Sequence, residues 1–312
     1  MSIAQQMAAR SQGVFYGWWI VAAVFVCEMF AIGSTSYAFG LFVIPVGEEL
    51  GLSRADANTG LILLLAGMGA SAPLTGSLLD KVPVRAVLVG GALTMGVGFV
   101  VLALAHSPWV MGASMLLLVG PGAGAIGPLS ATTVVTRWFN QSRGKAMGLT
   151  AVATSVGGSV LVPIMAFNLS LLGWRSTLLL QGLLIATVVS VIAWIFIRDR
   201  PADVGLQTDG CIEGDEQPLR ESENVSWTLG TLFKCRDFWC ITVAVGLTFA
   251  VSQAILASLI PYARDIDIGV GQASFLVSVL ALSSIAGKLA FGTIADRVDK
   301  RWLLLVIILF II

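Results

Sequence analysis

Eight long apolar stretches follow one another along the chain, and they constrain its fold more than any other feature. They cover about residues 15–44, 58–79, 84–105, 109–136, 145–171, 175–197, 237–262 and 271–294. Each holds about 20 residues or more, the length that an α-helix needs to cross the hydrocarbon core of a bilayer. The chain is 57% hydrophobic and only 12% charged, which leaves too little polar surface to cover a soluble globule. We therefore expect an all-α, polytopic membrane protein that sits in a lipid bilayer.

A ninth apolar stretch begins at Trp302 and reaches Ile312, roughly half of a spanning helix, so about 8.5 helices can be counted. One long polar segment, with several glycines and many acidic residues, separates the first six helices from the rest. We expect three units: a six-helix bundle at 1–198, a cytoplasmic linker at 199–235, and an incomplete bundle at 236–312. If the second half mirrors the first, the intact protein has twelve helices.

The positions of lysine and arginine predict the orientation. With the amino terminus inside, most of the 18 basic residues lie in cytoplasmic segments, whereas only Arg54, Arg175 and Arg264 lie outside. Lys288 lies within a helix. Because basic residues concentrate on the cytoplasmic side of membrane proteins, the amino terminus is expected in the cytoplasm. We expect a multi-pass protein of the cell membrane, which would be the inner membrane of a bacterium.

Several functional classes are disfavoured. The net charge is zero and the single histidine is His106, so the sequence holds neither a basic patch for nucleic acid nor a histidine cluster for a metal. No nucleophile or paired acid and base marks an enzyme. The glycine-rich run in the fourth helix contains GxGxxG but follows no strand, so it is not a nucleotide fingerprint. We expect small residues there to let helices approach closely, with Pro121 and Pro128 loosening or breaking the helix.

Two decapeptides nearly repeat each other, each directly after a long apolar run. They are Gly76-Ser-Leu-Leu-Asp80-Lys-Val-Pro-Val-Arg85 and Gly292-Thr-Ile-Ala-Asp296-Arg297-Val-Asp-Lys-Arg301. Such a repeat indicates two related halves, as in many secondary transporters. An aspartate at a helix end can accept from free amides at a neighbouring helix amino terminus, and an arginine can complete that contact. The alternative is that both loops are only basic turns that set the topology.

These loops are the candidate gating residues, together with Arg143 at the start of the fifth helix. By pseudo-symmetry, Asp296 is expected to face Arg143 and Gly144. Asp80 is expected to face an eleventh helix that this chain lacks, and so to have no partner here.

Through these two loops, the chain resembles the major facilitator superfamily. Further motifs resemble its monocarboxylate transporter and oxalate-formate antiporter group: Tyr16-Gly17-Trp18-Trp19, Arg137-Trp138-Phe139 with Arg143-Gly144, Gly173-Trp174-Arg175, and Pro201-x-Asp203-x-Gly205. The resemblance implies a helical bundle that moves a small organic anion, a mono- or dicarboxylate, by alternating access. Proton symport and anion exchange are both open, and no cofactor is implied. We expect a monomer.

Two ionisable residues, Glu28 and Lys288, lie well inside apolar helices, where each costs about 2.5–3.5 kcal/mol on insertion scales. In the resembled group the place of Lys288 often holds an arginine that binds the substrate carboxylate. Ser284 stands where the monocarboxylate branch often has an acidic residue. Glu28 is a candidate proton site. The alternatives are that Lys288 snorkels towards the cytoplasm and that Glu28 is a structural hydrogen-bonding residue.

Tyr37 and Gln253 are further candidates for the cavity, because Tyr37 lies near the face of Glu28 and Gln253 is a polar residue in the seventh helix. Two other functions stay open. One is export of hydrophobic compounds, although Met115, Leu116 and Leu117 stand where drug exporters of the superfamily usually have an arginine. The other is a membrane sensor that does not transport.

Overall fold

The computed structural model describes residues 15–209 and 233–295, with side chains to residue 289. Within these ranges the chain is helical and contains no strand. The helices of the first half are α2 (Gly17–Ile32), η1 (Gly33–Tyr37), α3 (Phe39–Leu50), α4 (Arg54–Lys81), α5 (Val84–Leu104), α6 (Pro108–Ser114), η2 (Met115–Val119), α7 (Gly120–Ile126), α8 (Pro128–Trp138), α9 (Arg143–Leu184), η3 (Ile185–Val189) and α10 (Ser190–Phe196). They are followed by η4 (Pro201–Val204), α12 (Arg236–Asp265) and α13 (Val270–Ala295).

Seven helical segments of the described ranges are long and apolar enough to cross a membrane. One of them, Arg143–Phe196, has 54 residues and would be about 80 Å long if straight, more than twice a hydrocarbon core of about 30 Å. Gly173 divides it, with φ 77° and ψ 169°. The segment therefore supplies two crossings, and the eight predicted spans are confirmed. The expectation of an all-α, polytopic membrane fold is confirmed as well.

The ends of the first two helices differ from the sequence expectation. The first extends to Leu50, beyond the predicted residue 44, and ends at Gly51, whose φ of 64° suits glycine. The second begins at Arg54 because Ser53 caps it, its Oγ accepting from the N–H of Asp56 at 3.2 Å. Both helices thus include polar residues beyond the apolar stretches that predicted them.

The fourth crossing is broken where its prolines predicted a break. Gly127 has non-helical ψ of −155° between α7 and α8, and Pro128 begins the next helix. Upstream, a Cβ on Gly122 would lie 2.6 Å from the backbone nitrogen of Met95, so only glycine permits this approach of α7 to α5. The interpretation of the glycine-rich run as a close-packing and breaking segment is confirmed.

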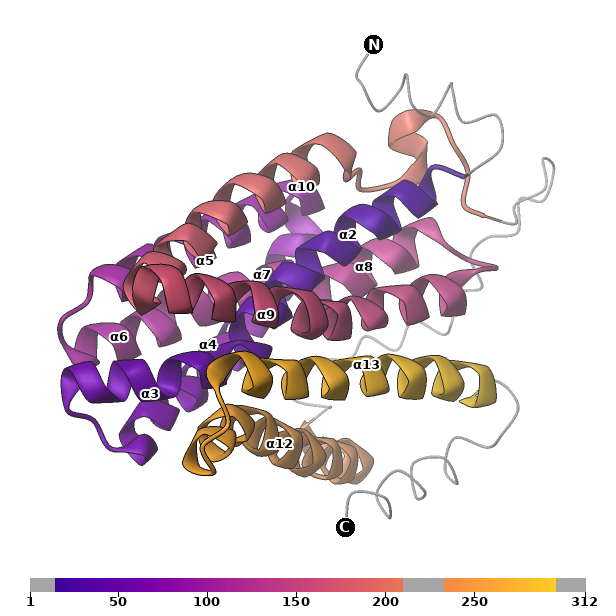
Figure 1. The fold of residues 1–312 in the computed structure, drawn as a ribbon. Helices are drawn as coiled ribbons and strands as arrows, with labels where there is room; N and C mark the ends of the chain where they lie inside the picture. The colour runs from indigo at the N-terminus through magenta and orange to yellow at the C-terminus, as the bar shows by residue number, and fades with distance from the viewer. Residues whose placement is uncertain (1–14, 210–232, 296–312) are drawn as a thin grey trace.

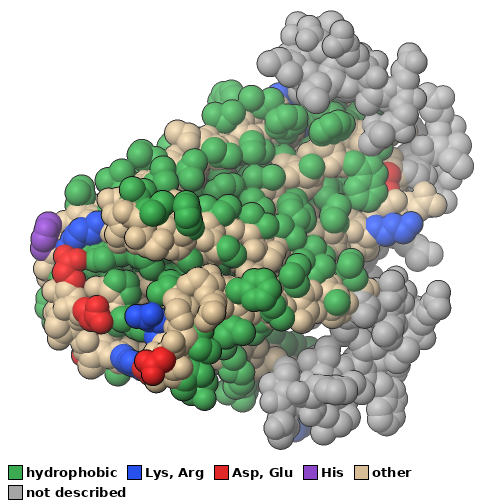
Figure 2. All heavy atoms as spheres, viewed as in Figure 1, with side chains coloured by type: hydrophobic (Ala, Val, Ile, Leu, Met, Phe, Trp, Pro, Cys, Tyr) green, Lys and Arg blue, Asp and Glu red, His purple; other side chains and the backbone are tan. Residues whose placement is uncertain are grey.

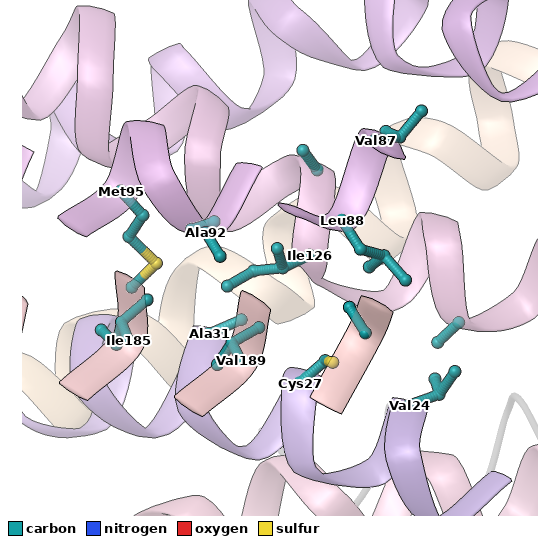
Figure 3. Packing of buried hydrophobic residues seen from close by; sticks show 14 of the residues in the cluster. Val24, Cys27, Ala31, Val87, Leu88, Ala92, Met95, Ile126, Ile185 and Val189 are labelled. Carbon is teal, nitrogen blue, oxygen red and sulfur yellow. The ribbon is translucent and has the colours of Figure 1, made fainter. Parts of the chain in front are cut away.

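An apolar core fills the first half. Figure 3 shows side chains of α2, α5, α7 and η3 meeting there, among them Cys27, Leu88, Met95, Ile126 and Ile185. The outer surface is also apolar over its middle, and Figure 2 shows charged side chains gathered at the end where α3 and α6 lie. This distribution is what a bilayer requires, with apolar atoms facing lipid and charges at the ends.

We call the end that holds Arg54, Arg175 and Asp265 the outer end, and the end that holds Lys81, Arg137 and Arg198 the inner end, after the predicted orientation. Figure 1 shows α12 and α13 together on one side of the first half, with α13 alongside α9. The buried side chains of α12 all fall between Gln253 and Ala263, near the outer end. From Arg236 to Ser252 its side chains are exposed or half-exposed. Within the described ranges, α12 therefore meets the first half mainly near the outer end, whereas α13 packs extensively on α9.

The first residues of the predicted linker pack onto the inner end of the first half. Asp199 accepts from the N–H of Val84 at 2.8 Å, at the start of α5. Asp209 accepts from the N–H groups of Asn140, Gln141 and Ser142, just before α9. Partial burial alone would raise the pKa of Asp209, but these hydrogen bonds outweigh it and hold the pKa below its ordinary value. The boundaries of the three units stay a prediction.

Candidate functional site

Lys288 lies on α13 and reaches across to α9. Its Nζ donates to the carbonyl oxygen of Ala151 at 2.9 Å, to Oγ1 of Thr154 at 2.6 Å and to Oγ of Ser155 at 2.8 Å. The ammonium is therefore turned into the junction between the two halves. This placement disfavours the snorkelling alternative, in which the side chain would extend to the inner surface.

Glu28 lies on α2, with only 3% of its surface exposed. Its Oε2 is buried and has no hydrogen-bond partner among the described residues. The charges of Glu28 and Lys288 lie close enough to interact, although no ion pair joins them in the described ranges. The structure thus brings together the two ionisable residues that the sequence singled out, from α2 and α13.

The other two candidates lie nearer the outer part of the junction. Tyr37 is half-buried in η1, and its ring occupies the space that a side chain at Gly158 would need, 2.4 Å from the hypothetical Cβ. Gln253 is 9% exposed on α12, and its Nε2 has no partner among the described residues. No hydrogen bond in the described ranges joins Tyr37 or Gln253 to Lys288. Their part in the site stays a prediction.

Three hydroxyl residues belong to the site but were not singled out from the sequence as parts of it. Thr154 and Ser155 contact Lys288 directly, and Ser155 Oγ donates to Ser284 Oγ at 3.2 Å. Serine and threonine are common in membrane helices, so their presence in an apolar run carries little signal. The contact of Thr154 and Ser155 with Lys288, three and two residues before the close approach of Gly157 to Met29, is visible only in three dimensions.

The gating residues are only partly within the described ranges. Asp80 is exposed, and no hydrogen bond or ion pair joins it to a described residue; Arg85 instead stacks over the ring of Trp194, 5.1 Å from its centroid. Gly76 and Arg143 lie in α4 and at the start of α9, and a Cβ on Gly76 would meet nothing within 4 Å. Gly292 is described only as backbone of α13. Asp296, Arg297 and Arg301 lie outside the described residues, so their expected contact with Arg143 stays a prediction.

Several motifs that carried the resemblance are structural joints of the first half. Trp138 Nε1 donates to the carbonyl of Arg198 at 2.9 Å, and Tyr16 OH donates to that of Phe196 at 2.9 Å. At the outer end, Arg175 and Trp174 donate to the carboxylate of Glu49, at 2.7 Å and 2.6 Å. The hydrogen bonds from Arg175 and Trp174 hold the pKa of Glu49 below its ordinary value. These motifs therefore stabilise the fold of the first half, and none of these contacts involves Lys288 or Glu28.

At the outer end, an ion pair joins the halves. Arg54, at the start of α4, donates through both Nη atoms to the carboxylate of Asp265, at the end of α12. More than two turns earlier on α12, a Cβ on Gly40 would lie 3.0 Å from the carbonyl oxygen of Ala257, so α3 and α12 approach closely. An apolar cluster that includes Leu41, Leu256 and Ile260 packs at this junction between the halves.

A cavity lies elsewhere, inside the outer part of the first half. It has a volume of about 630 Å³ and lies between α3, α4, α6 and η2. Its walls are mainly apolar, with Phe39, Phe42, Trp109 and Met111 among them. None of Glu28, Tyr37, Gln253 or Lys288 lines it. It is therefore separate from the ionisable site.

Comparisons with known proteins place the chain in a family. Residues 24–312 match the model of the Major Facilitator Superfamily. The oxalate:formate antiporter of Oxalobacter formigenes is 23% identical over 93% of this chain and 66% of its own length. Monocarboxylate transporter 11 of Mus musculus is 30% identical over 90% of this chain and 60% of its own length. This chain thus spans about two thirds or less of the length of these relatives.

Solved structures agree on the fold. A bacterial homolog of the human lysosomal transporter Spinster, in an inward-facing and occupied conformation, superposes with a TM-score of 0.67 at 16% identity, over 93% of this chain and 63% of the other. At that identity the likeness concerns the fold alone. Taken with the helical bundle, the match over nearly the whole sequence shows that the chain belongs to the Major Facilitator Superfamily.

Proposed function

We propose that the protein carrying this chain is a secondary transporter of a small organic anion, a mono- or dicarboxylate. The observation that carries the proposal is the Lys288 ammonium, which lies in the junction between the halves and is bonded to α9. A lysine within a membrane helix costs about 2.5–3.5 kcal/mol on insertion scales, so its place in the junction calls for a function. An ammonium there supplies a counter-charge for a carboxylate. The names of the oxalate:formate antiporter and of the monocarboxylate transporters support this substrate class.

Alternating access would proceed by rocking of the two halves about the Lys288 site. The proposal is supported by the packing of α12 on the first half, whose buried side chains all lie near the outer end, and by the Lys288 contacts that join α13 to α9 nearer the inner end. Glu28 is the candidate proton site, since its carboxyl is buried with one oxygen unpaired among the described residues. The carrier works as a monomer in the cell membrane, with its amino terminus in the cytoplasm.

The test is uptake of labelled formate, oxalate and L-lactate into liposomes that contain the purified protein, with and without an imposed proton gradient. We expect saturable uptake in the wild type. Lys288→Ala should raise the KM by about 10- to 150-fold, because it removes hydrogen bonds to a charged group worth about 1.5–3 kcal/mol. Lys288→Arg should keep part of the activity. Lys145→Ala, which removes an exposed lysine at the inner end, is the matched control and should transport normally.

A second candidate function, export of hydrophobic compounds, is favoured by one observation, the apolar cavity of about 630 Å³ in the first half. Cavities of this size and lining commonly hold small apolar ligands. Efflux of a hydrophobic dye that is lost in Met111→Trp, which fills the cavity, and is indifferent to Lys288→Ala would support export. Carboxylate uptake that is lost in Lys288→Ala and unaffected by Met111→Trp would reject it.

A further inference from the structure

The Lys288 ammonium has no free proton in this structure. An ammonium carries three N–H donors and no acceptor. Its donors are matched by three oxygens of α9, those of Ala151, Thr154 and Ser155, at distances from 2.6 to 2.9 Å. A carboxylate that binds Lys288 must therefore replace at least one of them.

The two hydroxyls are suited to being replaced. Thr154 Oγ1 donates its own proton to the carbonyl of Ala151 at 3.0 Å, and Ser155 Oγ donates to Ser284 at 3.2 Å. Each therefore offers Lys288 only a neutral lone pair. Hydrogen bonds between two ionised groups are stronger than those to neutral acceptors, so a carboxylate outcompetes a hydroxyl for the ammonium. A carbonyl oxygen of the backbone, by contrast, remains in place whatever binds.

These bonds also tie the two halves together, because α9 belongs to the first half and α13 to the second. We propose that Thr154 and Ser155 are positioning residues that hold Lys288 on α9 while the carrier is empty. We call their hydrogen bonds with Lys288 the latch, and an anion breaks the latch by binding the ammonium in place of a hydroxyl. The inference rests on the proposed carrier function and adds a regulation to it. An empty carrier is restrained from rocking, so exchange of anions is faster than net transport, which requires the empty carrier to return.

The test compares two rates in liposomes that contain the purified protein. Labelled oxalate, formate or L-lactate is added outside vesicles that are either preloaded with the same unlabelled anion, which measures exchange, or empty, which measures net uptake. In the wild type, exchange should exceed net uptake. Thr154→Val keeps the shape of the side chain but removes the acceptor, so it should lower the ratio of exchange to net uptake at least fivefold, and Ser155→Ala should act in the same direction.

Two controls separate a latch from a general loss of packing. Thr154→Ser restores the acceptor and should restore the ratio. Ser278→Ala removes another hydrogen bond between α13 and α9, from Ser278 Oγ to the carbonyl of Ser159 at 3.3 Å, without touching Lys288. It should leave the ratio at the wild-type value. A misfolded variant lowers both rates together and leaves the ratio unchanged.

The outcomes distinguish the two proposals. Carboxylate transport that depends on Lys288, with the same ratio in Thr154→Val and Ser155→Ala as in the wild type and with exchange rates near the wild-type value, overturns the latch and leaves the carrier function standing. Absence of carboxylate transport in the wild type, or transport indifferent to Lys288, overturns the carrier function and the latch with it. A lowered ratio in Ser278→Ala equal to that in Thr154→Val also overturns the latch.

Discussion

The junction between the two halves is built differently at its two ends. Towards the outer end, α3 and α12 pack backbone against backbone at Gly40, with an apolar cluster and the Arg54–Asp265 pair around them. Deeper in, α13 is tied to α9 through the polar contacts of Lys288, while the inner part of α12 stays exposed. The first contact is apolar packing, whereas the second adds the hydrogen bonds of one charged side chain to the packing of α13 on α9.

This difference matters for switching. Packing contacts are individually small and numerous, so no small ligand can replace them at once. A single ammonium can exchange its partners, because a carboxylate competes directly for the same protons. Under the proposed carrier function, we expect the outer contact to set the resting conformation and the Lys288 contact to respond to the substrate.

The largest effect is expected from filling the closest approach at the outer end. Gly40→Val would place a side chain against the carbonyl of Ala257, and the overpacking should lower the free energy of unfolding by about 1–3 kcal/mol and slow transport strongly. Gly246→Val on the exposed inner part of α12, where a Cβ meets nothing within 4 Å, is the matched control. Thermal unfolding in detergent measures both. Equal destabilisation by the two variants would refute the packed outer junction.

A smaller effect is expected from the outer ion pair, whose side chains are 57% and 43% exposed. Arg54→Glu should speed opening of the outer end up to about fivefold, since exposed pairs contribute little. The measurement is the labelling rate of a cysteine at Leu41, which is buried in the junction, by an impermeant thiol reagent added outside. The swap of Arg54→Asp with Asp265→Arg should return the rate towards that of the wild type. A labelling rate unchanged by Arg54→Glu would mean that the pair does not hold the outer end.

The smallest effect is expected at the inner end of the first half, where Asp209 accepts from the backbone before α9. Asp209→Ala should cost about 1 kcal/mol of stability, as for loss of a helix cap, and Asp209→Asn should cost less because it keeps one acceptor oxygen.

The same contact predicts a pH dependence with a definite sign. Because the pKa of Asp209 is lowered in the folded state, its stabilisation is present above the unfolded value of about 3.9 and is lost as the pH falls through the folded pKa. The stability difference between wild type and Asp209→Ala should therefore be constant near neutrality and shrink below about pH 4. A difference that grows on acidification would contradict the assignment.

Much of the fold could be predicted from the sequence, because apolar runs of spanning length and the prolines of the fourth helix act locally. The break at Gly127 and the bend at Gly173 follow from glycine and proline chemistry in this way. The extension of the first helix to Leu50 was missed, since its last residues are polar and are stabilised at the outer end by contacts of Glu49 with a distant helix.

The site was predictable only for its ionisable residues. Glu28 and Lys288 are conspicuous in apolar helices because their burial is costly. Thr154 and Ser155 are not, since hydroxyls satisfy themselves within any helix by bonding to a carbonyl one turn back. Asp209 likewise lies in a segment interpreted as a connector, and its contact before α9 depends on how the chain returns to the bundle. Sequence identifies unusual residues, whereas the partners they find depend on helix packing.

The most direct test of the account is a distance measured across the inner end of the junction, with and without substrate. Spin labels at Leu149 on α9 and Ile241 on α12, both exposed, would be placed in a protein freed of its native cysteines. Addition of oxalate or L-lactate should move part of the population to a shorter distance in the wild type and leave the Lys288→Ala distribution unchanged. The same shift in Lys288→Ala, or no shift in a wild type that transports these anions, would contradict the claim that the anion acts through Lys288.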